Sequence, residues 1–419
     1  MTPRAILIWS VVFTGCGPSA SDTAVPVVET EWSYTVVDSD QADCYSATGT
    51  MDCPSVGEDF DGQDAQYLRY TPSYDSDGEI VVDNMTGLVW QWEQIDDVVY
   101  SDAESYCEDL ELGGISSWRV PTVKEAYSLI LFDGVTGSGE LTSSSAPDDA
   151  VPYIDNDAFD FTYGTPRYID VQFITSNIYV GDGYGSNDGT VAGEECFFGT
   201  NLADGRIKCY PTNEMGSYQL RCVTGNEDYG LNDLEDLGDG TIADNATGLQ
   251  WMASDSGGLG AGSEGDGTLD WGEALAHCED LDSAGYTDWR LPDAKELQSI
   301  VDYRRSPDTT DSAAIDALFD ATVITGEDGY DNYGFYWTGT THLDGIDLGA
   351  AGVYVSFGEG LGYMSMTPDE PENYLDVHGA GAQRSDPKSG DRDDYPQTFG
   401  PQGDVLRVYN MARCVRDLE

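Results

Sequence analysis

The spacing of apolar residues predicts a short helix at two corresponding places in the chain. In residues 100–110 (YSDAESYCEDL) and 270–281 (DWGEALAHCEDL), apolar side chains recur at the interval that places them on one helix face. They are Ala103, Cys107 and Leu110 in the first segment, and Ala274, Cys278 and Leu281 in the second. Each segment follows a similar stretch, DGEIVVDNMTGLVWQW at 77–92 and DGTIADNATGLQWM at 239–252, so the pattern indicates an internal repeat.

A second helix is predicted after each of two related stretches, WRVPTVKEAYSLI from Trp118 and WRLPDAKELQSIV from Trp289. In both, a short polar residue precedes a glutamate at the spacing of a capping box, which marks a helix start. The capping pairs are Thr122 with Glu125 and Asp293 with Glu296. We expect the two tryptophans in the core. The arginines that follow them, Arg119 and Arg290, are expected to have a structural role and to pair with buried carboxylates.

Short apolar segments among glycine-rich turns predict β-strands in the later part of each repeat. They lie at 168–177, 335–341 and 352–360, and each repeat ends in a strand that carries a cysteine, at 218–225 and 406–417. Each repeat is therefore expected to fold as a separate module. A sheet that continues through both repeats would contradict this expectation.

Composition and charge limit the number of domains and the classes of partner that the protein can bind. A chain of 419 residues with 40% apolar residues is long enough for two domains. It carries 78 Asp and Glu against 18 Lys and Arg, a net charge of −60. Nucleic-acid partners are excluded, because their binding depends on lysines and arginines that displace counterions. The acidity predicts a strongly solvated surface, with carboxylate binding of divalent cations as the alternative.

The N-terminus is typical of an exported protein. Residues 1–15 contain Arg4 and then an apolar run too short to span a bilayer, which indicates a signal peptide. The letters FTGC, ending at Cys16, resemble the bacterial lipobox, whose cysteine is lipidated and anchors the mature chain. We expect residues 16–30 to form a tether and the protein to lie in the cell envelope, at the outer membrane or cell surface. An ordinary cleaved signal with an incidental cysteine is the alternative.

The eight cysteines after Cys16 predict a disulfide framework, as is usual in exported chains. A bridge from the first helix to the last strand would close each repeat. Two further pairs lie close together in the sequence and are expected to be local. The expected bridges are Cys107–Cys222, Cys278–Cys414, Cys196–Cys209 and Cys44–Cys53.

The combined motifs resemble one protein family. Asp-Asn-x-Thr-Gly-Leu-x-Trp, the helix cysteine, Trp-Arg-x-Pro-x-x-x-Glu, Tyr-Trp-Thr-Gly and the terminal Arg-Cys-Val-Arg are similar to the Lcl C-terminal domain family, also called DUF1566. The resemblance implies two tandem domains, at 71–225 and 239–419, joined by a linker at 226–238. Residues 31–70 resemble the lead-in found before such domains in bacterial lipoproteins. We call them the lead-in segment.

The family resemblance also implies a fold class and a type of ligand. Members are similar to C-type lectins, which implies α+β domains with helices on a small twisted antiparallel sheet and a long loop before the last strand. Adhesins of the family imply binding of sulfated polysaccharides, but a charge of −60 is unsuited to that ligand. Carbohydrate of another kind, or another extracellular ligand, is therefore the expected partner, and the only membrane contact expected is the lipid anchor.

Two segments of the second repeat hold the candidate ligand residues. In PDEPENYLD, Glu370, Glu372 and Asn373 differ by one residue from the calcium motif of C-type lectins, so calcium is the only cofactor that the pattern suggests. A chance match in an acidic loop is the alternative. The following segment is expected to be a loop that presents polar groups of both signs. Its candidate binding residues are His378, Arg384, Asp386, Lys388 and Asp391.

The expected function is therefore non-enzymatic binding or adhesion at the cell surface. An oxidoreductase on the same scaffold, similar to formylglycine-generating enzymes, would need a reactive cysteine pair near the C-terminus. Each last strand offers one cysteine, and the bridges above already use it. A passive surface scaffold is the third alternative.

Overall fold

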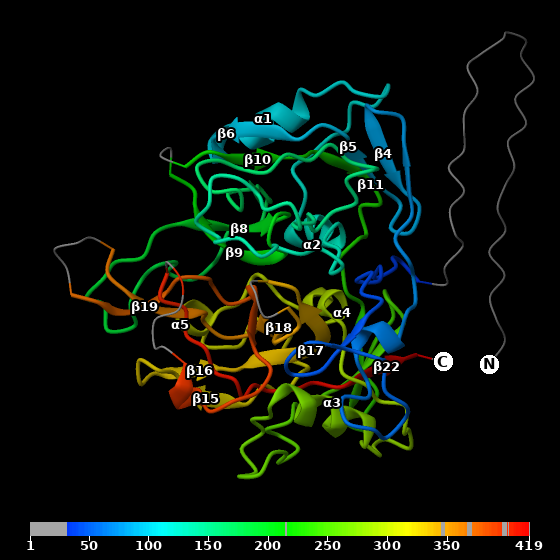
Figure 1. The fold of residues 1–419 in the computed structure, drawn as a ribbon, viewed down its shortest axis with the longest axis vertical. Helices are drawn as coiled ribbons and strands as arrows, with labels where there is room; N and C mark the ends of the chain where they lie inside the picture. Colours follow the sequence, from blue (N-terminus) through cyan, green and yellow to red (C-terminus); the bar gives the residue numbers. More distant parts are fainter. Residues whose placement is uncertain are drawn as a thin grey trace, which may run out of the picture.

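A computed structural model describes residues 32–213, 216–344, 348–366, 371–395, 400 and 402–418. Within these ranges the chain is mostly β, with short helices and several sheets (Figure 1). No helix in these ranges is long and apolar enough to cross a membrane. Cys16 and Glu370 lie outside the described residues, so the predictions made for them stay predictions.

The largest sheet has eight strands and contains strands of both repeats (Figure 1). In spatial order they are β17 (Phe335–His342), β18 (Ala351–Ser356), β21 (Gln383–Pro387), β9 (Arg206–Pro211), β8 (Cys196–Asn201), β7 (Gln172–Phe173), β10 (Tyr218–Leu220) and β6 (Ile95–Val98). The repeats join where β21 pairs with β9, with Gln383 opposite Ile207. The expectation of two separately folded modules is therefore wrong, because their edge strands pair with each other and remove two exposed sheet edges.

Each repeat also has a four-stranded antiparallel sheet with the same spatial order of equivalent strands. In the first repeat the strands are β3 (Tyr74–Ser76), β4 (Ile80–Asp83), β5 (Leu88–Gln91) and β11 (Val223–Gly225). In the second they are β12 (Leu234–Asp236), β13 (Thr241–Asp244), β14 (Leu249–Met252) and β22 (Val415–Asp417). In both, the last strand returns to pair with the third strand of its sheet in chain order, β5 in the first repeat and β14 in the second.

The predicted helices form. They are α1 (Ala103–Glu108) and α2 (Val123–Ser128) in the first repeat, and α3 (Trp271–Glu279) and α4 (Ala294–Ser299) in the second. Both predicted capping boxes are present, at Thr122 and at Asp293. The remaining elements are short: β1 (Cys44–Tyr45), β2 (Thr50–Met51), α5 (Pro307–Thr310), β15 (Val323–Thr325), β16 (Asp331–Tyr333), β19 (Leu361–Met364), β20 (Asn373–Asp376), and single turns at Asp64–Gln66, Tyr100–Asp102 and Arg392–Asp394.

All four predicted disulfide bridges are confirmed: Cys44–Cys53, Cys107–Cys222, Cys196–Cys209 and Cys278–Cys414. The two long bridges join the first helix of a repeat to its end, and none crosses between the repeats. Covalent closure is thus separate for each repeat, while the sheet is shared.

The two capping helices meet at the centre of the molecule, where α2 faces α4 (Figure 1). Lys124 on α2 donates to the carbonyl of Ser299 at 2.6 Å, and Lys295 on α4 donates to the carbonyl of Ser128 at 2.9 Å. Each lysine therefore satisfies the C-terminal end of the opposite helix, where carbonyl groups lack partners within the helix. The reciprocal contacts show that the repeats are related by an approximate two-fold arrangement.

The lead-in segment packs into the core of the molecule. Gln41 donates to the carbonyls of Phe132 in the first repeat, at 3.1 Å, and Thr341 in the second, at 2.8 Å. The buried Asp64 carboxylate accepts from Ser39 at 2.7 Å and also from Thr340. The segment before the first repeat thus fastens the two repeats to each other.

A second set of contacts between the repeats should respond to pH. Glu359 accepts from Asn187 at 2.7 Å, and Asp376 accepts from Tyr179 at 2.6 Å. Burial, together with the repulsion between the two carboxylates, raises the pKa of Glu359 to about 8, and burial raises that of Asp376 to about 6. Because these carboxyl groups bind protons more tightly in the folded state, folding is stabilised as the pH falls through those values.

We therefore expect the melting temperature to rise as the pH is lowered from about 8 to about 5. Glu359→Gln removes one titrating group and should reduce that rise by about 2 to 4 °C. Differential scanning fluorimetry of both proteins at each pH measures the difference. Equal slopes for the wild type and the variant would exclude this origin of the pH dependence.

Candidate functional site

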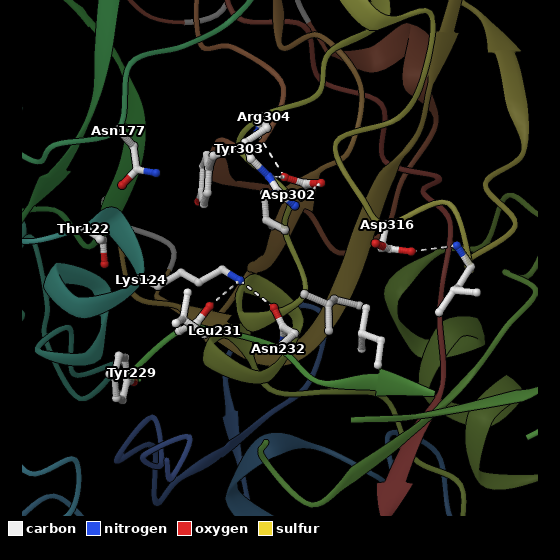
Figure 2. Close-up of a pocket in the computed structure, with 15 residues that line it drawn as sticks. Thr122, Lys124, Asn177, Tyr229, Leu231, Asn232, Asp302, Tyr303, Arg304 and Asp316 are labelled. Atoms are coloured by element: carbon white, nitrogen blue, oxygen red, sulfur yellow. Dashed lines mark hydrogen bonds and ion pairs between the residues drawn. The ribbon is translucent and has the colours of Figure 1, made fainter. Parts of the chain in front are cut away.

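A cleft of about 500 Å³ opens where the two repeats meet. Figure 2 shows that its walls come from α2, Asn177 after β7, the segment that joins the repeats, and the chain that follows α4. The lining residues are Thr122, Lys124, Asn177, Tyr229, Gly230, Leu231, Asn232, Leu234, Ile300, Val301, Asp302, Tyr303, Arg304, Asp316 and Leu318. Because both repeats supply walls, neither repeat alone would form this cleft.

Lys124 fixes the joining segment against both helices. Besides Ser299, its ammonium donates to the carbonyl of Gly230 at 3.1 Å and to Oδ1 of Asn232 at 2.9 Å (Figure 2). Burial lowers the pKa of Lys124 to about 8, because the charged form loses hydration. The lysine thus uses its donors on the protein itself and keeps one wall of the cleft rigid.

The side-chain amide of Asn177 lines the cleft, and its nitrogen donates no hydrogen bond within the described part of the chain. Its Oδ1 accepts from the backbone N–H of Val123, the first residue of α2, at 2.9 Å. This bond fixes the orientation of the amide, and Figure 2 shows the amide nitrogen directed to the side on which Tyr303 lies. A positioned amide donor of this kind suits recognition of a hydroxyl or carbonyl oxygen.

The opposite wall carries an aromatic ring and charged groups. The Tyr303 hydroxyl donates to the carbonyl of Gly381 at 3.1 Å, which fixes the ring. Asp302 accepts from the Arg304 side chain at 2.8 Å, although that side chain is 86% exposed. Asp316 is half-buried and accepts from the backbone of Leu318 at 2.9 Å. The wall therefore offers acceptor and donor groups beside a largely buried tyrosine ring.

Two leucines line the cleft from exposed positions. Leu231 is 62% exposed and Leu318 is 41% exposed. Apolar side chains around a polar interior form a surface for ligands that have both hydroxyl groups and apolar faces. Sugars have this character, because their rings combine equatorial hydroxyls with C–H faces.

The predicted ligand residues of the second repeat are mostly buried, in and beside strand β21. His378, Asp386 and Lys388 are each at most 2% exposed. Asp386 accepts from the amide of Asn410 at 3.0 Å, and burial raises its pKa to about 6. The segment is therefore a core strand with its flanks, which corrects the expectation of a loop that presents these three residues to ligands.

The basic groups of this segment have partners inside the protein. Lys388 donates to Thr341 at 2.7 Å, with its ammonium 3.7 Å from the centre of the Trp271 ring. Asp404 contacts Arg384 and lies 3.0 Å from Nε2 of His378. Burial lowers the pKa of His378 to about 4, so the ring is neutral at physiological pH. These groups hold β21 in place.

The structure describes two of the three predicted calcium residues, Glu372 and Asn373, so a site that includes Glu370 stays a prediction. Glu372 is exposed, and the Asn373 amide donates to Thr190 at 3.0 Å. Asp391, predicted as a ligand-binding residue, is exposed and accepts from the backbone N–H of Asp393 at 3.0 Å, where it caps a single helical turn. Among the described residues, no group of three or more His, Cys, Asp or Glu is arranged to hold a metal ion. The described residues therefore do not fit a calcium ion here.

The structural residues lie as expected. Trp118 is 3% exposed and Trp289 is 1% exposed. Arg119 binds both carboxylate oxygens of Glu125, at 2.5 and 2.7 Å. Arg290 binds both oxygens of Glu296, each at 2.6 Å. Burial of Glu296 opposes its ionisation, but the adjacent Arg290 outweighs this and lowers the pKa to about 2.

Sequence reasoning missed the cleft. Its residues come from α2, the end of the β7 segment, the joining segment and the chain after α4, and the packing of α2 against α4 brings them together. One signal was available: both capping helices carry a lysine at the same position, Lys124 and Lys295. Lysine is rarely buried without a specific partner, so its repetition beside two core tryptophans could have indicated contact between the repeats.

The comparison with protein families agrees with the repeat. The family model of the Lcl C-terminal domain matches the chain twice, at residues 79–224 and 240–375. The two matches cover more than half of the chain, so the protein belongs to this family. No curated protein and no solved structure matches the chain.

Proposed function

We propose that this chain is a non-enzymatic surface protein that binds a carbohydrate in the cleft between its two repeats. The observation that carries the proposal is the composition of the cleft. The cleft contains a positioned amide donor (Asn177), a carboxylate (Asp316) and an aromatic ring (Tyr303). Exposed leucines line the same cleft. Such a combination suits a neutral ligand rich in hydroxyl groups, and a chain of net charge −60 favours a neutral ligand over a sulfated one.

The proposal includes the anchor and the fold type. Cys16 would carry the lipid, and the tether would hold the folded repeats at the outer membrane or cell surface. Each repeat would be a variant of the C-type-lectin-like fold. Support comes from the bridge between first helix and last strand, and from the return of that strand to the first sheet.

The alternative of an oxidoreductase is less well supported. Formylglycine-generating chemistry needs reactive thiols, and the eight cysteines in the described ranges are all in disulfides. Titration of the folded protein with a thiol reagent tests this alternative. A reactive thiol at Cys222 or Cys414 would favour the enzyme.

A glycan array probed with the wild type and with Leu318→Asp tests the binding proposal. Leu318 is exposed, so the substitution should leave the fold intact but place a charge at the cleft. We expect the wild type to bind neutral glycans and the variant to bind at least about tenfold more weakly. Arg304→Ala is expected to weaken binding in the same direction, because its guanidinium lines the same wall.

Leu259→Asp is the matched control, since Leu259 is 39% exposed and does not line the cleft. It should bind as the wild type does, and EDTA should leave binding unchanged. Failure of the wild type to bind any glycan would favour a passive scaffold. Equal loss in the Leu318 and Leu259 variants would place binding elsewhere on the surface.

A further inference from the structure

A second opening, of about 730 Å³, lies entirely in the first repeat and the segment that follows it. We call it the α1 groove. One wall is the Tyr100 turn and α1, with Glu104 and Glu108, and the others carry Arg119 and Ser176. It shares Thr122, Tyr229 and Leu231 with the cleft, whereas Ser176 and Glu108 line the α1 groove alone.

Each wall of the α1 groove has an equivalent in the second repeat. Aligning the helix cysteines places Trp271 opposite Tyr100 and Glu279 opposite Glu108. The strands align in the same way. In the first repeat, the N–H of Ser176 donates to the carbonyl of Pro121 at 2.8 Å. In the second, the N–H of Gly339 donates to the carbonyl of the equivalent Pro292, also at 2.8 Å. The second repeat therefore contains the same groove.

In the second repeat this groove is filled by the lead-in segment. Phe60 stacks on the ring of Trp271, with 6.0 Å between ring centres. Tyr67 donates its hydroxyl to Glu279 at 2.6 Å, and the Arg290 guanidinium lies 5.3 Å from the centre of the Tyr67 ring. The groove thus holds a peptide by one stacked aromatic, one hydroxyl and one cation–π contact.

In the first repeat, no equivalent segment among the described residues fills the groove. Tyr229 corresponds to Tyr67, counting back from the DG(E/T)I motif, and it lines the α1 groove. The residues shortly before it, however, form β11, the last strand of the first repeat itself, so the chain that leads to Tyr229 does not occupy the place of Phe60. The exposure of the paired arginines differs accordingly, at 34% for the Arg119 side chain against 6% for Arg290.

We propose that the α1 groove binds a peptide segment of a partner protein, in the way that the second repeat binds the lead-in segment. The charge of the walls sets the chemistry of that segment. Glu104 stands where the second repeat has Leu275, and Glu227 lines the opposite side, so the groove carries more exposed carboxylates than its filled counterpart. The partner segment therefore combines an aromatic residue, which stacks on Tyr100, with basic residues beside it.

The test uses synthetic peptides and the full chain. The first peptide is residues 57–70 (GEDFDGQDAQYLRY), and the second has lysine in place of Glu58, Asp59 and Asp61. We expect saturable binding of the lysine peptide, measured by fluorescence anisotropy, and at least about tenfold weaker binding of the acidic one. The difference should shrink at high salt. Phe60→Ala in the lysine peptide should lower affinity about tenfold.

Ser176→Trp fills the α1 groove from an exposed position and should abolish binding of the lysine peptide. Ser105→Trp, on the exposed side of α1 away from the groove, should leave binding intact. Glu108→Lys gives a second variant that reverses a charge of the groove and should also abolish binding. Absence of binding by the lysine peptide, or equal affinity in the two tryptophan variants, would overturn the proposal. Neither result bears on glycan binding in the cleft, which Leu318→Asp and Arg304→Ala report separately.

Discussion

Replacing Arg290 with methionine is expected to lower the free energy of unfolding by about 3 to 5 kcal/mol. The substitution leaves the Glu296 carboxylate buried, at 2% exposure, without its bidentate partner. Of the ion pairs that Glu296 makes with described residues, the one with Arg69, at 3.4 Å, would remain. Removing one member of a buried ion pair costs more than the pair contributes, because the other charge stays desolvated. Urea unfolding followed by tryptophan fluorescence measures the change.

Arg119→Met is the matched comparison, because the same residue pair occurs in the first repeat in a more exposed setting. Its cost should be smaller, since water reaches the Arg119 side chain and can solvate Glu125 after the substitution. If the two variants lost equal stability, cover by the lead-in segment would not explain the difference between the repeats.

Replacing Cys278 and Cys414 with alanine is expected to destabilise the protein by about 4 to 5 kcal/mol, the loop-entropy value for so long a loop. The bridge joins residues separated by 136 positions, from α3 to the residue before β22. Its removal frees the chain end whose strand completes the sheet of the second repeat. Calorimetric melting under non-reducing conditions measures the loss.

Cys44 and Cys53 provide the control, because their bridge spans only nine positions. The entropy model gives about 2 to 3 kcal/mol for a loop of that size. A larger loss from the short bridge than from the long one would show that local packing, not loop closure, determines the effect.

The local pattern of the chain predicted the helices, their capping boxes and the disulfide pairing. Those features depend on residues a few positions apart, or on cysteines placed alike in two repeats, and the structure agrees at Thr122, Asp293 and all four bridges. Strands were predicted less well. Of residues 168–177, only Gln172 and Phe173 form a strand, because the neighbouring residues meet loops from distant parts of the chain.

The candidate site could not be predicted from the sequence, because it depends on how the repeats pack. The segment from His378 to Lys388 was expected to be exposed because it carries charged residues. Asp386 and Lys388 are nevertheless buried, and their hydrogen-bond partners lie far away in the sequence. Polar residues are buried when the fold supplies partners, and single-chain patterns do not reveal those partners. The cleft at Lys124 was missed for the same reason.

The path of the lead-in segment has a consequence for how such a gene can evolve. The segment precedes the first repeat in the chain but occupies a groove of the second. Its residue Gln41 forms hydrogen bonds with both repeats. Deleting either copy would strip the survivor of contacts that the other supplies, so the duplication is no longer reversible by simple loss. Natural variants of this architecture should therefore retain both copies and diverge mainly around Tyr100 and Ser176, where no described internal segment constrains the groove.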